Sequence, residues 1–167
     1  MSPTNALGNW YANLVYVGRA QFIMATSERS LLTVLLPAVD LRKSLVPNLC
    51  DATALLLLHL GVDENRAVRE TEAMQEARFG RTDSRSVLAS MNDLSRSLGW
   101  YLEGGAAPIE VMLGFAQTPM TGVAPKGESH GYPGEAARTL LGVEGRWPVP
   151  AEWCGKMSAD DEPLARR

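Results

Sequence analysis

The chain has 167 residues, of which 46% are hydrophobic and 21% are charged, and its formal net charge is −3 at pH 7. This length fits one domain of ordinary size, and the composition is typical of a folded protein and not of a disordered one. The slightly acidic balance provides no electrostatic footprint for nucleic acid or for an anionic membrane surface, so nucleic-acid binding is disfavoured.

The N-terminal stretch 10–37 combines β-forming residues with a tight turn signal. Strands are predicted over 10–17 and 20–26, because the two residues Gly18 and Arg19 suit a type II′ hairpin loop. A two-residue loop pairs the flanking residues symmetrically, and the strands therefore pair Val17 with Ala20, Val15 with Phe22, Leu14 with Ile23, and Asn13 with Met24.

A second turn, at Glu28 and Arg29, is predicted to return residues 30–36 along the second strand. The neighbours across these two strands are predicted to be Ile23 and Val34, Met24 and Thr33, and Ala25 and Leu32. The result is a three-stranded antiparallel meander.

Both faces of this meander carry apolar side chains, so we expect helices or a second copy of the chain to cover both. One face carries Trp10, Ala12, Leu14, Ile23, Ala25, Leu32 and Val34. The other face carries Val15, Val17, Phe22, Leu31 and Leu35, with the polar Asn13 and Thr33 flanking Met24. Asn13 and Thr33 are candidate ligand-binding residues, and the simpler interpretation is that Asn13 bonds to backbone or lies near solvent.

Three helices are predicted next. Asp40 is placed to cap a short helix over 40–46, which Pro47 interrupts or restarts, and a second helix is predicted over 48–60 with Gly61 as its left-handed cap. Asp63 is predicted to cap a third helix that runs to about Phe79.

The third helix is predicted to have a solvated charged face and a buried apolar one. The outward residues are Arg66, Arg69, Glu70, Glu72 and Glu76, and the inward residues are Ala67, Met74 and Ala77. No function is assigned to this charged face.

The segment 84–102 is predicted to be an amphipathic helix with the apolar stripe Val87, Leu88, Met91, Leu94, Leu98 and Tyr101. Arg85, Asn92 and Arg96 lie opposite that stripe, and Ser86, Ser90, Asp93 and Ser97 lie on the flank between. This helix is either an ordinary surface helix with Asp93 paired to Arg96, or part of a binding site.

Gly104 and Gly105 are predicted to end that helix, and Pro108 to open another. A loop over 117–134 carries His130, and a short helix is predicted over 135–141. We predict a single domain over 1–143 and a C-terminal extension over 144–167 that bears Trp147 and Trp153. The predicted fold class is therefore α+β, with the meander packed by four to five helices.

The sequence lacks phosphate-binding, dinucleotide-binding and nucleophile-elbow glycine motifs and the zinc-protease histidine motif. With His59 and His130 as the two histidines, and Cys50 and Cys154 far apart, no metal site, cofactor or disulfide is predicted. Cys50 is interpreted as a core residue.

The longest strictly apolar run, 54–58, is far short of the ~20 residues of a membrane span, and no signal peptide is evident, so a cytoplasmic protein is expected.

Three runs of the sequence carry a resemblance to a known family. The runs WYANL at 10–14 and SERSLLTVLLP at 27–37, followed later by RSVLASMNDL at 85–94, resemble an uncharacterised bacterial family of small α+β proteins. The resemblance extends over about 7–141 and implies the order of the fold but no activity. Ala89 stands where that family is expected to have glycine.

Two functions of different class follow. The first is a non-catalytic binding or protein-interaction module that associates with itself or with another protein through the edge or second face of the meander. The alternative is a small enzyme, or a binder of a phosphorylated or nucleotide-like ligand, that uses Arg85, Ser86, Asn92 and Asp93 with Asn13, Thr33 or His130. The ligand itself is unknown.

Overall fold

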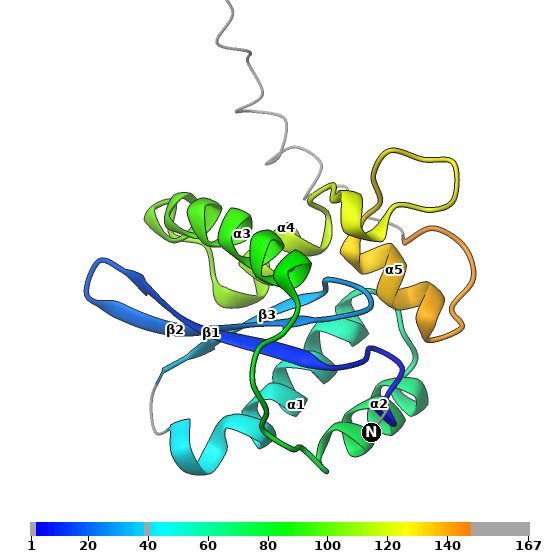
Figure 1. Ribbon diagram of the computed structural model, residues 1–167, viewed down its shortest axis with the longest axis horizontal. Helices are drawn as coiled ribbons and strands as arrows, with labels where there is room; N and C mark the ends of the chain where they lie inside the picture. Colours follow the sequence, from blue (N-terminus) through cyan, green and yellow to red (C-terminus); the bar gives the residue numbers. More distant parts are fainter. Residues whose placement is uncertain (1–2, 39–40, 148–167) are drawn as a thin grey trace, which may run out of the picture.

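The computed structural model describes residues 3–38 and 41–147, and it has the predicted α+β fold. A three-stranded antiparallel sheet comes first and five α-helices follow it (Figure 1). The strands are β1 (Trp10–Val17), β2 (Ala20–Ser27) and β3 (Thr33–Pro37), and the helices are α1 (Leu41–His59), α2 (Glu64–Met74), α3 (Arg85–Glu103), α4 (Pro108–Ala116), the 3-10 turn η1 (Thr121–Val123) and α5 (Pro133–Leu140).

The first hairpin has the predicted register. In it Val17 pairs with Ala20 and Asn13 pairs with Met24, and the two-residue loop begins at Gly18, whose φ is +59°. A positive φ at this position is one that glycine adopts without steric cost. The strand order is β1-β2-β3, so both β1 and β3 are edge strands.

The register predicted for β3 is wrong by two residues. Met24 lies opposite Leu35, Ala25 opposite Val34 and Ile23 opposite Leu36, and Thr33 lies opposite Thr26. The reversal takes four residues and not two, because the Ser27 N–H donates to the carbonyl of Leu32 and Leu31 takes a φ of +56°. A two-residue shift keeps each side chain on its face, so the predicted division into faces holds.

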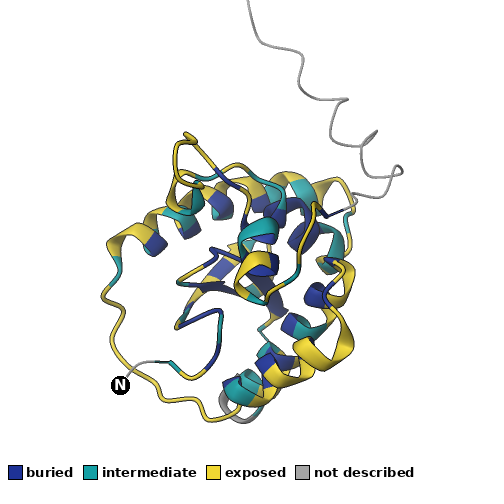
Figure 2. Ribbon diagram, turned by 90° about the vertical axis from the view of Figure 1, so that its right-hand side faces the viewer, coloured by how far each residue is buried: buried dark blue, intermediate teal, exposed yellow. Residues whose placement is uncertain are grey.

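Helices cover both faces of the sheet, as one of the two predicted arrangements requires. In Figure 1, α1 and α2 lie below the sheet, and α3, α4 and α5 lie above it. Figure 2 shows the buried residues on the sheet and on the helix sides that face it. The largest side chains that are fully buried include Phe115, Leu7, Met24 and Leu32.

The predicted break at Pro47 does not occur, because α1 runs unbroken through that residue from Leu41 to His59. Proline removes one hydrogen-bond donor, and packing on the sheet retains the helix around it. The predicted cap is confirmed: Gly61 has a φ of +76°, and the Val62 N–H donates to the carbonyl of Leu57. This bond, with that from the Gly61 N–H to the Leu58 carbonyl, forms a Schellman motif. Asp40 lies outside the described residues.

Helix α2 begins as predicted and ends early. The Asp63 carboxylate accepts a hydrogen bond from the Arg66 N–H at 3.1 Å, as an N-cap does. The helix stops at Met74 and not near Phe79, so Ala77 is exposed and does not face inward.

Glu70 corrects the predicted outer face of α2, because its side chain is only 4% exposed. Its two carboxylate oxygens accept hydrogen bonds from the N–H groups of Ala6, at 2.8 Å, and Leu7, at 2.9 Å. The N-terminal segment thus covers this flank of the helix, which the helical pattern alone does not reveal.

The apolar stripe of α3 is confirmed. Val87, Met91, Leu94 and Leu98 are buried, and Leu88 and Tyr101 are partly buried against the core. The Ser84 hydroxyl caps the helix by accepting a hydrogen bond from the Val87 N–H at 3.4 Å.

The end of the described chain is fastened to α1 and α5. The Trp147 indole N–H donates to the His59 carbonyl at 3.0 Å, and its main-chain N–H donates to Glu135 Oε1 at 2.8 Å. Arg138, which is 4% exposed, donates to the Leu60 carbonyl. The boundary predicted at 143 stays a prediction, and Trp153 and Cys154 lie outside the described residues.

Candidate interaction surface

The outer edge of β1 is the candidate interaction surface, because its outward main-chain groups have no main-chain partner among the described residues. The Glu28 N–H donates to the Asn9 carbonyl at 2.8 Å, which fixes the alternation of the ladder between β1 and β2. Hydrogen-bonded and non-hydrogen-bonded pairs alternate in an antiparallel ladder. The odd-numbered residues of β1 therefore bond to β2, and the N–H and C=O groups of Trp10, Ala12, Leu14 and Tyr16 point away from the sheet.

Apolar and neutral side chains accompany these outward main-chain groups. Leu14 is 39% exposed and Tyr16 is 64% exposed, and Ala12 and Asn13 are exposed as well. The strand contains no charged residue and no proline, although these are the residues that natural proteins place on edge strands to prevent pairing. Within the described ranges, no main-chain hydrogen bond from outside the sheet reaches the outward groups of β1.

The opposite edge of the sheet is closed. Strand β3 has five residues, of which Thr33, Val34, Leu35 and Leu36 are buried, and it ends at Pro37. Short length, burial and a terminal proline each discourage pairing with another strand. The two edges therefore differ, and only β1 offers a long exposed strand to a partner.

Tyr11 connects the β1 edge to the segment 75–84, which links α2 below the sheet to α3 above it (Figure 1). The Tyr11 hydroxyl donates a hydrogen bond to Asp83 Oδ1 at 2.6 Å. This bond, together with burial, raises the pKa of Tyr11 to about 12, because both favour the protonated phenol. The hydroxyl thus holds the linking segment beside the sheet, where that segment passes β1 on its way from α2 to α3 (Figure 1).

The six residues predicted as a ligand site lie in three separate places. Arg85, Ser86, Asn92 and Asp93 are exposed together on α3, and Asp93 pairs with Arg96 at 3.4 Å. Asn13 is exposed on β1.

Thr33 is fully buried, and it lies apart from the other predicted site residues. Its hydroxyl is 2.8 Å from that of Thr26 and donates to the Leu31 carbonyl at 3.1 Å. Its hydrogen-bonding capacity is thus used within the sheet, where it stabilises the turn into β3.

The two histidines make local contacts. His59 Nδ1 lies 2.9 Å from the Leu55 carbonyl, and His130 Nδ1 lies 2.9 Å from the Ser129 hydroxyl. Cys50 is buried as predicted, and burial raises the pKa of its thiol. In residues 3–38 and 41–147, no group of three or more His, Cys, Asp or Glu side chains is placed to hold a metal ion.

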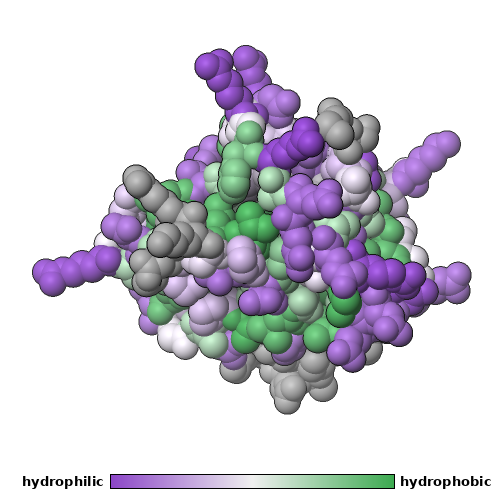
Figure 3. Space-filling model, turned by 90° about the horizontal axis from the view of Figure 1, so that it is seen from below, coloured by the Kyte–Doolittle hydropathy of each residue, from purple (hydrophilic) through white to green (hydrophobic). Residues whose placement is uncertain are grey.

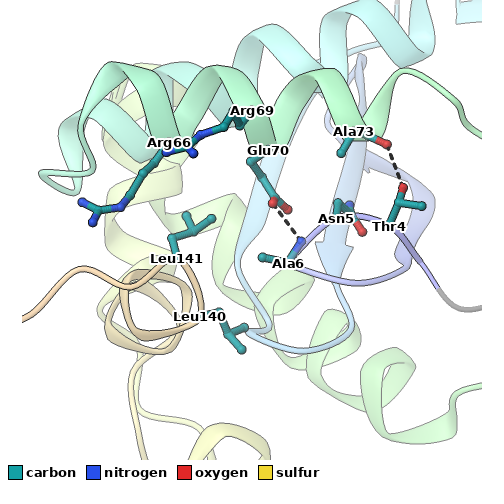
Figure 4. A pocket seen from close by; sticks show the side chains of 9 residues that line it. All are labelled: Thr4, Asn5, Ala6, Arg66, Arg69, Glu70, Ala73, Leu140 and Leu141. Atoms are coloured by element: carbon teal, nitrogen blue, oxygen red, sulfur yellow. Dashed lines mark hydrogen bonds between the residues drawn. The ribbon is translucent and has the colours of Figure 1, made fainter.

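A pocket of about 380 Å³ lies between the N-terminal segment, α2 and the end of α5 (Figure 4). None of the six predicted site residues lines it. The lining residues are Thr4, Asn5, Ala6, Arg66, Arg69, Glu70, Ala73, Leu140 and Leu141. The Glu70 carboxylate points at the N-terminal segment and is occupied by its main-chain bonds, and Arg66 pairs with Asp63 at 2.6 Å. The polar groups of this pocket mainly join the N-terminus to α2.

Sequence reasoning missed the pocket because it gave the first nine residues no role. One signal was present: Glu70 stands three residues after the inward Ala67 and four before the inward Met74. Residues at these spacings share one side of a helix. A carboxylate on that side predicts N–H donors nearby, since a buried charge requires partners.

The fold is that of a small α+β protein in which helices lie on both faces of a three-stranded sheet. The chain belongs to the family described as Domain of unknown function (DUF6933), whose model matches residues 1–136. Searches of curated proteins and of solved structures found no match. The predicted membership of an uncharacterised family is thus confirmed, while its bacterial origin stays a prediction. No helix in the described part of the chain is both long and apolar enough to span a membrane.

Proposed function

We propose that this protein is a non-catalytic protein-interaction module that binds its partner through the open edge of β1. The observation that carries this proposal is the contrast between the two sheet edges. Strand β3 is short and buried, while β1 presents eight residues without charge or proline and with Leu14 and Tyr16 exposed. An edge of this kind binds an extended strand by main-chain hydrogen bonds, and its exposed side chains select the partner.

Exposed apolar residues elsewhere provide the comparison. The side of the molecule formed by α1 and α2 also shows apolar areas between charged side chains (Figure 3). Leu58 on α1 is 46% exposed, which is close to the 39% of Leu14. Leu58 belongs to a helix whose main-chain groups bond internally, so it offers side-chain contact without a strand edge. Comparing substitutions at Leu14 and Leu58 therefore distinguishes binding through the strand edge from binding through any exposed leucine.

The experiment compares Leu14→Lys with Leu58→Lys in affinity capture from cells that express the tagged chain. A lysine on an edge strand opposes pairing, because its ammonium group must lose water when a second strand approaches. We expect Leu14→Lys to lose the protein that the wild type retains, and Leu58→Lys to keep it. Equal recovery by the two variants would contradict the proposal, as would a wild type that retains nothing.

A further inference from the structure

We infer that the pocket between the N-terminal segment, α2 and the end of α5 binds a small carboxylate that carries an apolar group. None of its lining residues belongs to β1, so this inference is independent of the proposed interaction at the strand edge. Its volume of about 380 Å³ lies near the lower end of the range for small-molecule sites, about 300–1,000 Å³. The space therefore suits a small ligand.

A buried amide without a partner is the first observation that indicates a ligand. Asn5 lines the pocket and is only 8% exposed, yet its side-chain amide makes no hydrogen bond within residues 3–38 and 41–147. Buried side-chain amides in proteins are nearly always hydrogen-bonded. The amide of Asn5 still reaches solvent, because it is not among the fully enclosed polar atoms that lack a partner in this part of the chain. It is therefore placed to donate to an acceptor in the pocket.

A guanidinium group without an acidic partner supplies the positive charge. Arg69 lines the pocket, and its Nε donates to the Asn65 carbonyl at 3.3 Å. Among the described residues, no carboxylate lies within ion-pair distance of Arg69, whereas Arg66 pairs with Asp63 at 2.6 Å. The nearby Glu70 carboxylate is bound instead by two main-chain N–H groups of the N-terminal segment. The Nη groups of Arg69 are thus left for an external anion, and their planar geometry matches the two oxygens of a carboxylate.

The remaining wall of the pocket is apolar. Figure 4 shows Leu140 and Leu141 facing α2 across the pocket, and Ala6 and Ala73 also line it. Leu140 is 41% exposed, so its side chain leaves apolar surface in water that a ligand can cover. An inorganic anion leaves this wall uncovered, and a neutral apolar molecule leaves Arg69 unpaired. A carboxylate with an apolar group satisfies both.

The test is an NMR titration of the full ¹⁵N-labelled chain with N-acetylleucine, which combines a carboxylate with an isobutyl group. The signals followed are the Asn5 side-chain NH₂ and the main-chain N–H of Leu141. We expect saturable shifts with a Kd on the order of 1 mM, the strength typical of so small a ligand. N-acetylleucinamide, which lacks the carboxylate, and acetate, which lacks the apolar group, should each bind at least fivefold more weakly.

Two matched variants locate the binding. Arg69→Gln should raise the Kd for N-acetylleucine at least fivefold, whereas Arg96→Gln, the same change at an exposed arginine on α3, should leave it unchanged. Both arginines are exposed, so neither change should disturb the fold. Asn5→Asp keeps the side-chain shape but places a second carboxylate against the probe, and it should abolish the shifts of the Leu141 N–H.

The inference is overturned if N-acetylleucine causes no saturable shift at millimolar concentrations, if N-acetylleucinamide binds equally well, or if Arg69→Gln and Arg96→Gln have the same Kd. None of these results affects the proposed function, which the capture experiment at Leu14 and Leu58 tests separately. Leu14→Lys should bind N-acetylleucine as the wild type does, because Leu14 does not line the pocket. Weaker binding by Leu14→Lys than by the wild type would show that the two surfaces are not independent, and would contradict the inference.

Discussion

Replacing Glu70 by glutamine is expected to destabilise the protein strongly, although the side-chain shape is kept. The carboxylate is 4% exposed and accepts from the N–H groups of Ala6 at 2.8 Å and Leu7 at 2.9 Å. Glutamine retains one oxygen and turns an NH₂ group toward the second N–H. Hydrogen bonds to charged groups contribute about 1.5–3 kcal/mol, and an unsatisfied buried donor costs about 1–3 kcal/mol. Because both figures describe one lost bond, we expect a loss of about 2–3 kcal/mol in the free energy of unfolding.

Urea denaturation followed by circular dichroism measures this loss, with Glu72→Gln as the control. Glu72 lies on the same helix and is exposed, so its substitution should change the free energy by less than about 0.5 kcal/mol. The thermal midpoint of Glu70→Gln should fall by about 4–12 °C, at about 2–4 °C per kcal/mol for this size. If Glu70→Gln lies within about 0.5 kcal/mol of the wild type, the N-terminal segment is not fastened to α2 as described.

Three further substitutions test other contacts by the same denaturation measurement. Tyr11→Phe should cost about 1–2 kcal/mol at pH 7, because it removes the donor to Asp83. The raised pKa of Tyr11, about 12, means that this contribution is complete below pH ~10 and is lost as the pH rises from ~10 toward ~12, so the variant should show a flatter alkaline decline. Gly61→Ala should cost about 1–2 kcal/mol, since φ is +76° and the added Cβ lies 2.9 Å from Arg138 Nη1. Arg138→Met should cost about 3 kcal/mol or more, because the buried Leu60 carbonyl and the partly buried Gly145 carbonyl lose their donor.

The two turns of the sheet show what local sequence can and cannot determine. The turn at Gly18 was predictable because glycine there permits a two-residue loop, and loop length fixes the register of a hairpin. The turn into β3 was not, because it contains no glycine and places Leu31 at a φ of +56°. The buried hydroxyls of Ser27 and Ser30 lie 2.5 Å apart and stabilise that conformation. Tertiary burial, which the sequence does not display, decides this register.

The errors on the helices have the same origin. Pro47 predicts an interruption of the helix, yet α1 continues through it because its apolar residues pack on the sheet. The sequence pattern predicts that Glu70 is exposed, yet the main-chain N–H groups of residues 6 and 7, which are distant in sequence, donate hydrogen bonds to its carboxylate. Amphipathic pattern predicted α3 well because one of its sides faces the core and the other faces solvent. Pattern fails where a third segment covers a helix.

The open edge of β1 illustrates a further limit. The sequence predicts a strand with apolar residues on both faces, and two helical layers satisfy both faces. The pattern of apolar residues does not tell an edge strand from a central one, because a residue such as Leu14 fits either position. It therefore does not reveal which main-chain groups lack a partner. Only the order β1-β2-β3 and the burial of β3 identify the edge that lacks a partner. Since Leu14 is 39% exposed, lysine at this position should weaken pairing with little effect on folding, so that the two requirements can be separated by experiment.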